Sequence, residues 1–229
     1  MQEHIFVREH MNTAQYKKPV FQQARKELPN QPFAVLSGPA FAQPLAMGLP
    51  SACTLASPSL TAGRWLASTL SYKNFRLYPT EDVIGVQLGG SLKNVIAIAV
   101  GIADGMGLSE NTRAMTITRG LHEIARFGTA LGAKPETFMG LSGMGDLILT
   151  CSPSSRNYSL GFAIGKGKTI SQLLKDASTT REGVYTARAA YEISKEKDID
   201  APLVQAVCDI LDERFSVEEA VEKLLSRPL

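Results

Sequence analysis

Several features that mark well-defined classes of protein are scarce in this sequence. Of its 229 residues only three are cysteine and three are histidine. Cys53, Cys151 and Cys208 lie far apart and form no C-x-x-C pair, which argues against a disulfide framework or a zinc site. We therefore expect no bound metal, and a reducing compartment.

An excess of one charge is also lacking. Lys and Arg number 24, Asp and Glu number 22, and no basic block occurs, which excludes the usual electrostatic signature of nucleic-acid binding. The longest apolar run, residues 95–103, is shorter than the roughly 20 residues that cross a bilayer. The first ten residues lack the apolar core of a secretory signal. We expect a cytoplasmic protein that binds neither nucleic acid nor membrane, although an organellar presequence upstream would change the compartment.

The third absence concerns phosphate binding. No G-x-G-x-x-G follows a predicted strand, so the pyrophosphate of a dinucleotide has no glycine-rich turn to bind. Residues 161–169 superficially resemble a phosphate loop, but a Walker motif ending at Thr169 requires glycine where Phe162 stands. The sequence therefore predicts no ATP site.

The patterns that are present divide the chain near residue 80. The first part, residues 1–80, contains a helical stretch at 60–70, and residues 1–16 are polar, without a clear period, and expected to be poorly ordered. Its β-like runs are residues 33–36, 52–56 and 75–78. These features are typical of a piece of an α/β layer.

The second part, residues 81–229, is predicted to be an all-α domain because its hydrophobic patterns are helical almost throughout. Helices are expected at residues 83–103, 111–131, 135–141, 159–165, 170–176, 183–195, 201–212 and 217–225.

Lys93 is the first candidate site residue because it stands at the head of a long apolar helix. Burial makes an ammonium easier to deprotonate, which suits proton transfer. At helical spacing Lys93, Ala97, Gly101 and Asp104 form one stripe, where a substrate or another helix could approach closely. A snorkelling lysine beside a helix-packing groove explains the same pattern. The pattern alone leaves both readings open.

The second candidate stretch, residues 140–157, places three glycines around one carboxylate, Asp146. We expect these glycines to let the backbone turn tightly and bring the carboxylate close to a partner. An acid near Lys93 would hold the ammonium and compensate its burial. Residues 155–157 combine a cationic fork with a hydroxyl and an amide, a set suited to phosphate oxygens. Together they favour a small phosphorylated carbonyl or alcohol as substrate.

An ordered set of motifs resembles the NAD(P)-dependent glycerol-3-phosphate dehydrogenase family, from about residue 32 to the C-terminus. The motifs are S37-G-P-A-F-A, G85-V-Q-L-G-G-S-L-K-N-V-I-A-I, N111-T-R-A, T118-R-G, G143-M-G-D-L-I-L-T-C, S155-R-N and E182-G. Members have a Rossmann domain followed by a helical domain, and they interconvert dihydroxyacetone phosphate and sn-glycerol 3-phosphate for phospholipid biosynthesis. The resemblance implies a mostly α fold: a helical domain like the C-terminal domain of 6-phosphogluconate dehydrogenase, preceded by a partial α/β Rossmann segment.

The resemblance also implies a role for each matching residue. Lys93 is the proton donor and acceptor at the substrate carbonyl or hydroxyl, and Asp146 contacts the substrate beside it. The other substrate contacts are Gly38, Ala40, Ser155, Arg156 and Asn157. The cofactor, NAD or NADP, is contacted by Ala42, Arg156 and Glu182. Since the family commonly has Ser or Thr where Ala40 stands, one hydroxyl contact is missing.

The family's glycine-rich first half is not found in this chain, so the sequence resembles the end of a Rossmann domain and a whole catalytic domain. Activity of this chain by itself is therefore doubtful. Two alternatives stay open: a related dehydrogenase of another small phosphorylated or acidic substrate, and an inactive truncated product that only binds a ligand or partner. Small residues on the Lys93 helix also permit a homodimer.

Overall fold

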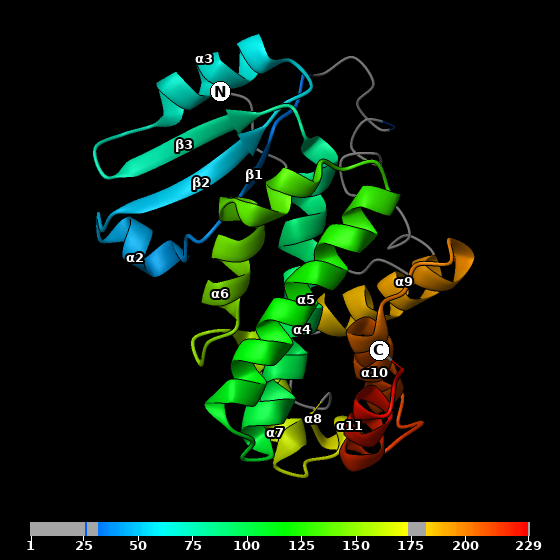
Figure 1. Cartoon of the computed structure of the whole chain (residues 1–229). Coiled ribbons are helices and arrows are strands. Elements are labelled where there is room, and N and C mark those ends of the chain that lie inside the picture. The colour runs from blue at the N-terminus through cyan, green and yellow to red at the C-terminus, as the bar shows by residue number, and fades with distance from the viewer. Residues whose placement is uncertain (1–25, 27–31, 174–181, 229) are drawn as a thin grey trace.

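The computed structural model describes residue 26 and residues 32–173 and 182–228 (Figure 1). The expectation of poor order for residues 1–16 concerns residues outside this described part. A three-stranded sheet with one covering helix lies at one end of the molecule, and a bundle of helices forms the rest (Figure 1). The prediction of a mostly α fold preceded by a partial α/β segment is confirmed.

The sheet has the order β1-β2-β3, with β1 (Val35–Ser37), β2 (Ser51–Ala56) and β3 (Phe75–Thr80). β1 runs antiparallel to β2, whereas β2 and β3 are parallel and joined through α3 (Leu60–Leu70). Ser59 begins α3 by accepting a hydrogen bond from the Ala62 amide. A short helix that the sequence did not reveal, α2 (Ala42–Ala46), follows β1.

The core of the helical part is built around α4 (Val83–Gly105), which packs against most of the other helices described. Asp82 caps its start by accepting from the Gly85 amide, and its second oxygen accepts from the Lys134 amide and the Thr137 hydroxyl. By length and hydropathy alone α4 could cross a membrane, but 61% of the apolar window is buried inside the fold. Its apolar surface therefore has partners within the protein, as in any core helix.

The remaining helices follow in chain order around α4. They are α5 (Glu110–Ala130), the 3₁₀ turn η1 (Pro135–Met139), the π turn η2 (Leu141–Gly145), α6 (Asp146–Thr150), α7 (Arg156–Gly165), α8 (Ile170–Leu173), α9 (Glu182–Glu196), α10 (Pro202–Leu211) and α11 (Val217–Leu225). Of the helix expected at 170–176, the part up to Leu173 is present as α8, and the rest of that range lies outside the described residues. The one expected at 159–165 begins earlier, at Arg156, because Ser155 caps it.

The stripe of small residues on α4 receives another helix, α7. A Cβ added at Gly101 would collide with the Tyr158 carbonyl oxygen, and one added at Gly161 would collide with the Ile98 carbonyl oxygen. Glycine on both helices thus lets their backbones approach without intervening side chains. This approach settles which neighbour of α4 occupies the stripe.

The tight turn expected from the three glycines before Asp146 is not formed, although the carboxylate does lie close to a partner, Lys93. None of Gly140, Gly143 and Gly145 has a positive φ, and the last two lie in the helical turn η2 rather than in a tight loop. A Cβ at Gly143 would collide with the Phe138 backbone. Gly143 therefore serves close packing against η1, whereas a Cβ at Gly140 or Gly145 would make only ordinary contacts.

Candidate functional site

Lys93 and Asp146 meet between α4 and α6. The Lys93 Nζ lies 2.5 Å from Asp146 Oδ2. The carboxylate side chain is 4% exposed and the lysine side chain 20% exposed, so the lysine is the more accessible member of the pair. The expected acid beside Lys93 is thus present.

Two hydroxyls complete the surroundings of Asp146. Thr150, one turn along α6, donates to Oδ1 at 3.4 Å, and Ser37, at the end of β1, donates to Oδ2 at 3.4 Å. Burial raises the pKa of Asp146 above its ordinary value, while the Lys93 ammonium and the two hydroxyls oppose that rise. The Lys93 charge is therefore the main group that favours the ionised carboxylate.

A pair of buried amides joins α4 and α7. Asn157 Nδ2 donates to Asn94 Oδ1 at 3.0 Å, and Asn94 directly follows Lys93 in the chain. Asn157 Oδ1 has no hydrogen-bond partner, and it is the single buried side-chain polar atom of that kind among the residues described. Gly183 lies against this oxygen. A buried acceptor without a donor carries a free-energy penalty that a bound hydroxyl would remove.

Arg156 occupies the first residue of α7 and is exposed. It has no ion-pair partner within the described ranges. Amide groups at a helix start and a guanidinium beside them both attract an anion. Ser155 is buried and caps α7 by accepting from the Tyr158 amide at 3.4 Å, so its hydroxyl already has a structural task.

The connection from β1 to α2 carries three more of the predicted residues. A Cβ at Gly38 would lie 2.9 Å from Cys53 Cα, so only glycine fits there. The Ala40 amide donates to the Gly38 carbonyl at 2.8 Å, and Ala42 is exposed at the first residue of α2. Pro39, between them, packs against the position of Gly145, next to Asp146. The structure therefore brings this connection to the edge of the ion pair.

The predicted cofactor residues Ala42, Arg156 and Glu182 are all exposed at helix starts. Glu182 precedes Gly183, the neighbour of Asn157. Within residues 32–173 and 182–228, no strand leads through a glycine-rich turn into a helix N-terminus. The described residues therefore provide no glycine-rich turn for a pyrophosphate.

Three residues of this cluster were missed from the sequence: Ser37, Asn94 and Thr150. Asn94 is adjacent to Lys93, and Thr150 lies four residues after Asp146, the spacing of neighbours on one helix face. Both signals could have been read. Ser37 has no such signal, because 109 residues separate it from Asp146.

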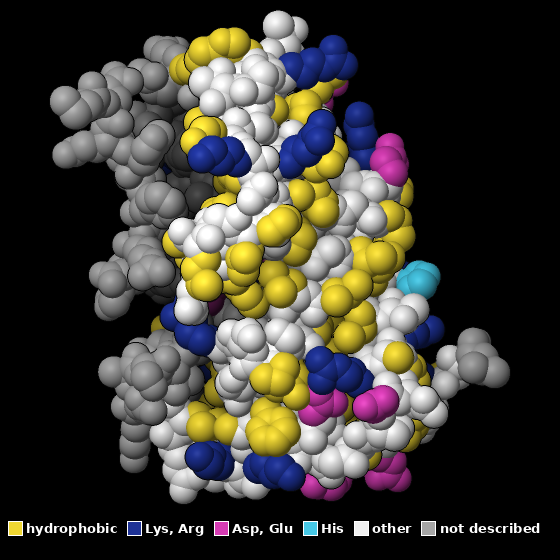
Figure 2. Space-filling view, turned by 90° about the vertical axis from the view of Figure 1, so that its left-hand side faces the viewer, with side chains coloured by type: hydrophobic (Ala, Val, Ile, Leu, Met, Phe, Trp, Pro, Cys, Tyr) yellow, Lys and Arg dark blue, Asp and Glu magenta, His cyan; other side chains and the backbone are white. Residues whose placement is uncertain are grey.

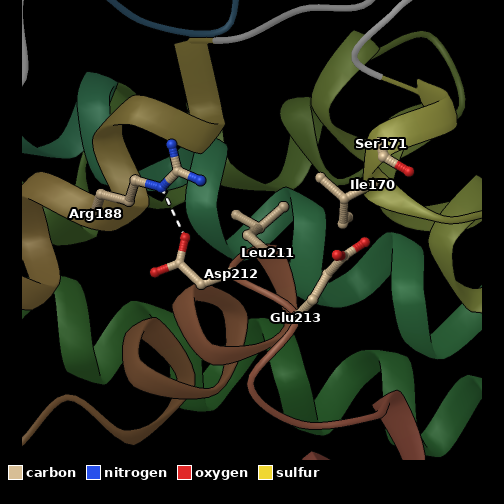
Figure 3. Close-up of a pocket in the computed structure, with 6 residues that line it drawn as sticks. All are labelled: Ile170, Ser171, Arg188, Leu211, Asp212 and Glu213. Carbon is tan, nitrogen blue, oxygen red and sulfur yellow. Dashed lines mark hydrogen bonds and ion pairs between the residues drawn. The ribbon is translucent and has the colours of Figure 1, made fainter.

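Hydrophobic side chains gather at the centre of the face shown in Figure 2, which is the side of β1–β3, α2 and α6 in Figure 1. Two pockets of about 400 and 410 Å³ lie elsewhere, among α8–α11. The first is drawn in Figure 3 and is lined by Ile170, Ser171, Arg188, Leu211, Asp212 and Glu213. Arg188 Nε donates to Asp212 Oδ1 there at 2.8 Å. Neither pocket is lined by a predicted site residue.

Comparison with known proteins gives one consistent result. A family model described as NAD-dependent glycerol-3-phosphate dehydrogenase C-terminus matches residues 82–222. A glycerol-3-phosphate dehydrogenase [NAD(P)+] of Rhodospirillum rubrum is 48% identical over 88% of this chain and 58% of its own length. One of a Synechococcus strain is 47% identical over 88% of this chain and 65% of its own length.

Solved structures agree with the sequence comparisons. The crystal structure of a glycerol-3-phosphate dehydrogenase from Coxiella burnetii has a TM-score of 0.86 and 39% identity, over 92% of this chain and 65% of that one. A Dunaliella salina structure with a TM-score of 0.80 is 23% identical over 90% of this chain and 38% of that one, and shows likeness of fold alone. The chain thus spans about three fifths of the length of these first curated relatives.

Proposed function

We infer the function of this chain from its family: it belongs to the NAD-dependent glycerol-3-phosphate dehydrogenases, and we propose that it carries their substrate-binding and proton-transferring part. The reaction is the interconversion of dihydroxyacetone phosphate and sn-glycerol 3-phosphate. The observation that supports this proposal best is the Lys93–Asp146 pair, in which the lysine side chain is the more exposed partner.

Lys93 has the position and the charge of a general acid. When the carbonyl at C2 is reduced, negative charge develops on its oxygen, and a nearby ammonium stabilises that charge and gives up a proton. In the opposite direction the neutral amine accepts the proton of the hydroxyl. Asp146, 2.5 Å from the lysine, holds it in place for this exchange.

The neighbouring residues suit the rest of such a substrate. The start of α7 with Arg156 offers charge-assisted hydrogen bonds to a phosphate. Asn157, whose buried Oδ1 has no hydrogen-bond partner, is proposed as a further substrate contact. Ser155, Gly38 and Ala40 stay proposed contacts of the substrate at the margin of the site.

The nicotinamide cofactor, NAD or NADP, supplies or accepts the hydride when it is bound. Ala42, Arg156 and Glu182 are proposed to contact its edge. We propose that this chain by itself binds the cofactor weakly, because its described residues offer no pyrophosphate cradle.

We also propose a cytoplasmic location, which suits three free, buried cysteines. A homodimer is proposed from the exposed apolar side chains, which a second copy could cover. Nothing in the charge balance favours a nucleic-acid partner.

The test compares NADH oxidation with dihydroxyacetone phosphate by two proteins. One is this chain; the other is this chain joined to the part of the Rhodospirillum rubrum relative that it does not cover. We expect turnover from the joined protein and none from the chain by itself. A folded joined protein that ignores dihydroxyacetone phosphate but reduces another small phosphate or acid would replace the proposed substrate. Binding without turnover of any such compound would favour a ligand-binding role.

A further inference from the structure

Arg113, in the first turn of α5, contacts three segments at once. One guanidinium nitrogen pairs with Asp104 on α4, the helix of Lys93, and the other donates to the Cys151 carbonyl. The guanidinium carbon lies 5.5 Å from the centre of the Tyr158 ring. The Tyr158 hydroxyl closes the network by donating to the same Asp104 oxygen at 2.7 Å.

The other two partners flank the connection between the helices that complete the site. Cys151 is the C-cap residue of α6, the helix that begins at Asp146. Tyr158 directly follows Asn157 on α7. A helix leaves its last carbonyls without intrahelical donors, so the Cys151 carbonyl needs an outside donor, and Arg113 provides one.

We propose that Arg113 is a positioning residue of the substrate site. Its planar guanidinium connects the end of α6 and the start of α7 to α4. It thereby fixes the positions of Asp146 and of residues 155–157 relative to Lys93. What the positioned residues bind rests on the proposed function; the positioning itself does not.

The fork geometry is what distinguishes this role from general stabilisation. Two separate nitrogens are used, one for Asp104 and one for Cys151. The Arg113 side chain is 30% exposed, so the ion pair by itself contributes little to the free energy of unfolding. A lysine would keep the ion pair and lose the second contact, because its single ammonium cannot reproduce a planar fork.

Hydrogen exchange measured by NMR on the whole chain tests the positioning. The reporters are the amides of Ser155, Tyr158 and Ser159, which all donate hydrogen bonds at this connection. Arg113→Lys and Arg113→Gln are compared with the control Arg126→Gln. Arg126 is on the same helix and pairs with Asp200 at 2.6 Å, away from α6 and α7.

Both Arg113 variants are expected to exchange these amides about tenfold faster or more, the factor that one charge-assisted hydrogen bond represents. Core amides of α4 should be unchanged, and Arg113→Lys should keep the wild-type unfolding midpoint. The control should show no local effect. Wild-type exchange in Arg113→Lys, or uniform acceleration that includes the α4 core, would overturn the inference.

Titration with sn-glycerol 3-phosphate gives the second readout. Arg113→Lys should weaken binding by about tenfold for the same reason, while Arg126→Gln binds as wild type does. Equal affinity in Arg113→Lys and wild type would contradict a role in the site. If the wild type binds no sn-glycerol 3-phosphate but the exchange pattern holds, the positioning stands and the proposed substrate fails.

Discussion

The helical part of this molecule, called the closed part below, encloses a much larger hydrophobic core than the sheet part does. The helical part has one continuous core of more than thirty buried apolar residues arranged around α4. The sheet part has a small cluster of four, namely Cys53, Leu55, Ala67 and Leu77. It exposes large apolar side chains at Leu36, Met47, Leu49, Trp65, Leu70, Tyr72 and Tyr78.

The difference shows which part of the molecule holds the proposed site. Lys93, Asp146, Asn94 and Asn157 all come from helices of the closed part, whose packing fixes their distances. The sheet part adds Ser37 at the edge of the cluster. A charged group such as the Lys93 ammonium keeps a fixed position only when the residues around it are rigid, and the helical core provides that rigidity.

The largest expected effect comes from removing the charge at the centre of the closed part. Lys93→Met should lower the turnover of the joined protein by a factor of about 100 or more, as expected for a lost general acid. Asp146→Asn should also damage activity more than stability. The measurement is steady-state kinetics alongside thermal unfolding. Near-normal turnover of folded Lys93→Met would remove Lys93 from its role.

The packing of the closed part can be broken with one methyl group. Gly161→Ala places a Cβ against the Ile98 carbonyl oxygen, which is backbone and cannot rotate away. We expect a loss of about 3 kcal/mol of unfolding free energy, the upper range for overpacking. Urea unfolding checks this value. A neutral result would mean that α4 and α7 separate easily.

The pH dependence of the unfolding free energy tests the packing of the closed part around Glu123. Its carboxylate accepts from the Leu203 and Val204 amides at the start of α10, and burial raises its pKa to about 7. Because the folded state binds this proton more tightly than the unfolded state, the stabilisation is full below about pH 4.5 and is lost as pH rises to about 7. From pH 5 to 8 the loss should be about 2 kcal/mol.

Urea unfolding at pH 5 and pH 8 measures this dependence, with Glu123→Gln as the control that carries no charge at either pH. The wild type should lose more stability across the range than the variant does. Parallel curves for the two proteins would show that Glu123 ionises normally.

The smallest expected effect is in the sheet part, where a substitution should raise the unfolding free energy instead of lowering it. Gly63 is buried in α3, but a Cβ there would lie 3.5 Å from Ser57 Cβ, an ordinary contact. Gly63→Ala should therefore raise the unfolding free energy by about 0.5–1 kcal/mol, the helix preference of alanine. Thermal unfolding beside Gly161→Ala decides whether the two parts differ as described. Destabilisation by both substitutions would remove the contrast.

The sequence allowed some of this to be predicted and not the rest. The bounds of α3 and α11 follow from local signals, such as the capping box that Ser216 and Glu219 form at the start of α11. The acid beside Lys93 was predictable because a half-buried ammonium needs a counter-charge. The helical state of η2 and α6 was not, since glycines that serve close packing look like glycines that serve a turn. Contacts such as Arg113 with Cys151 depend on tertiary packing that no local pattern records.

The central claim, that this chain carries the substrate half of its family's site, is tested most directly by calorimetric titration of the chain with sn-glycerol 3-phosphate and, separately, with NADH. We expect saturable binding of one sn-glycerol 3-phosphate, lost in Arg156→Ala and kept in Arg126→Gln, with weak or undetectable binding of NADH. Micromolar binding of NADH without binding of sn-glycerol 3-phosphate would contradict it.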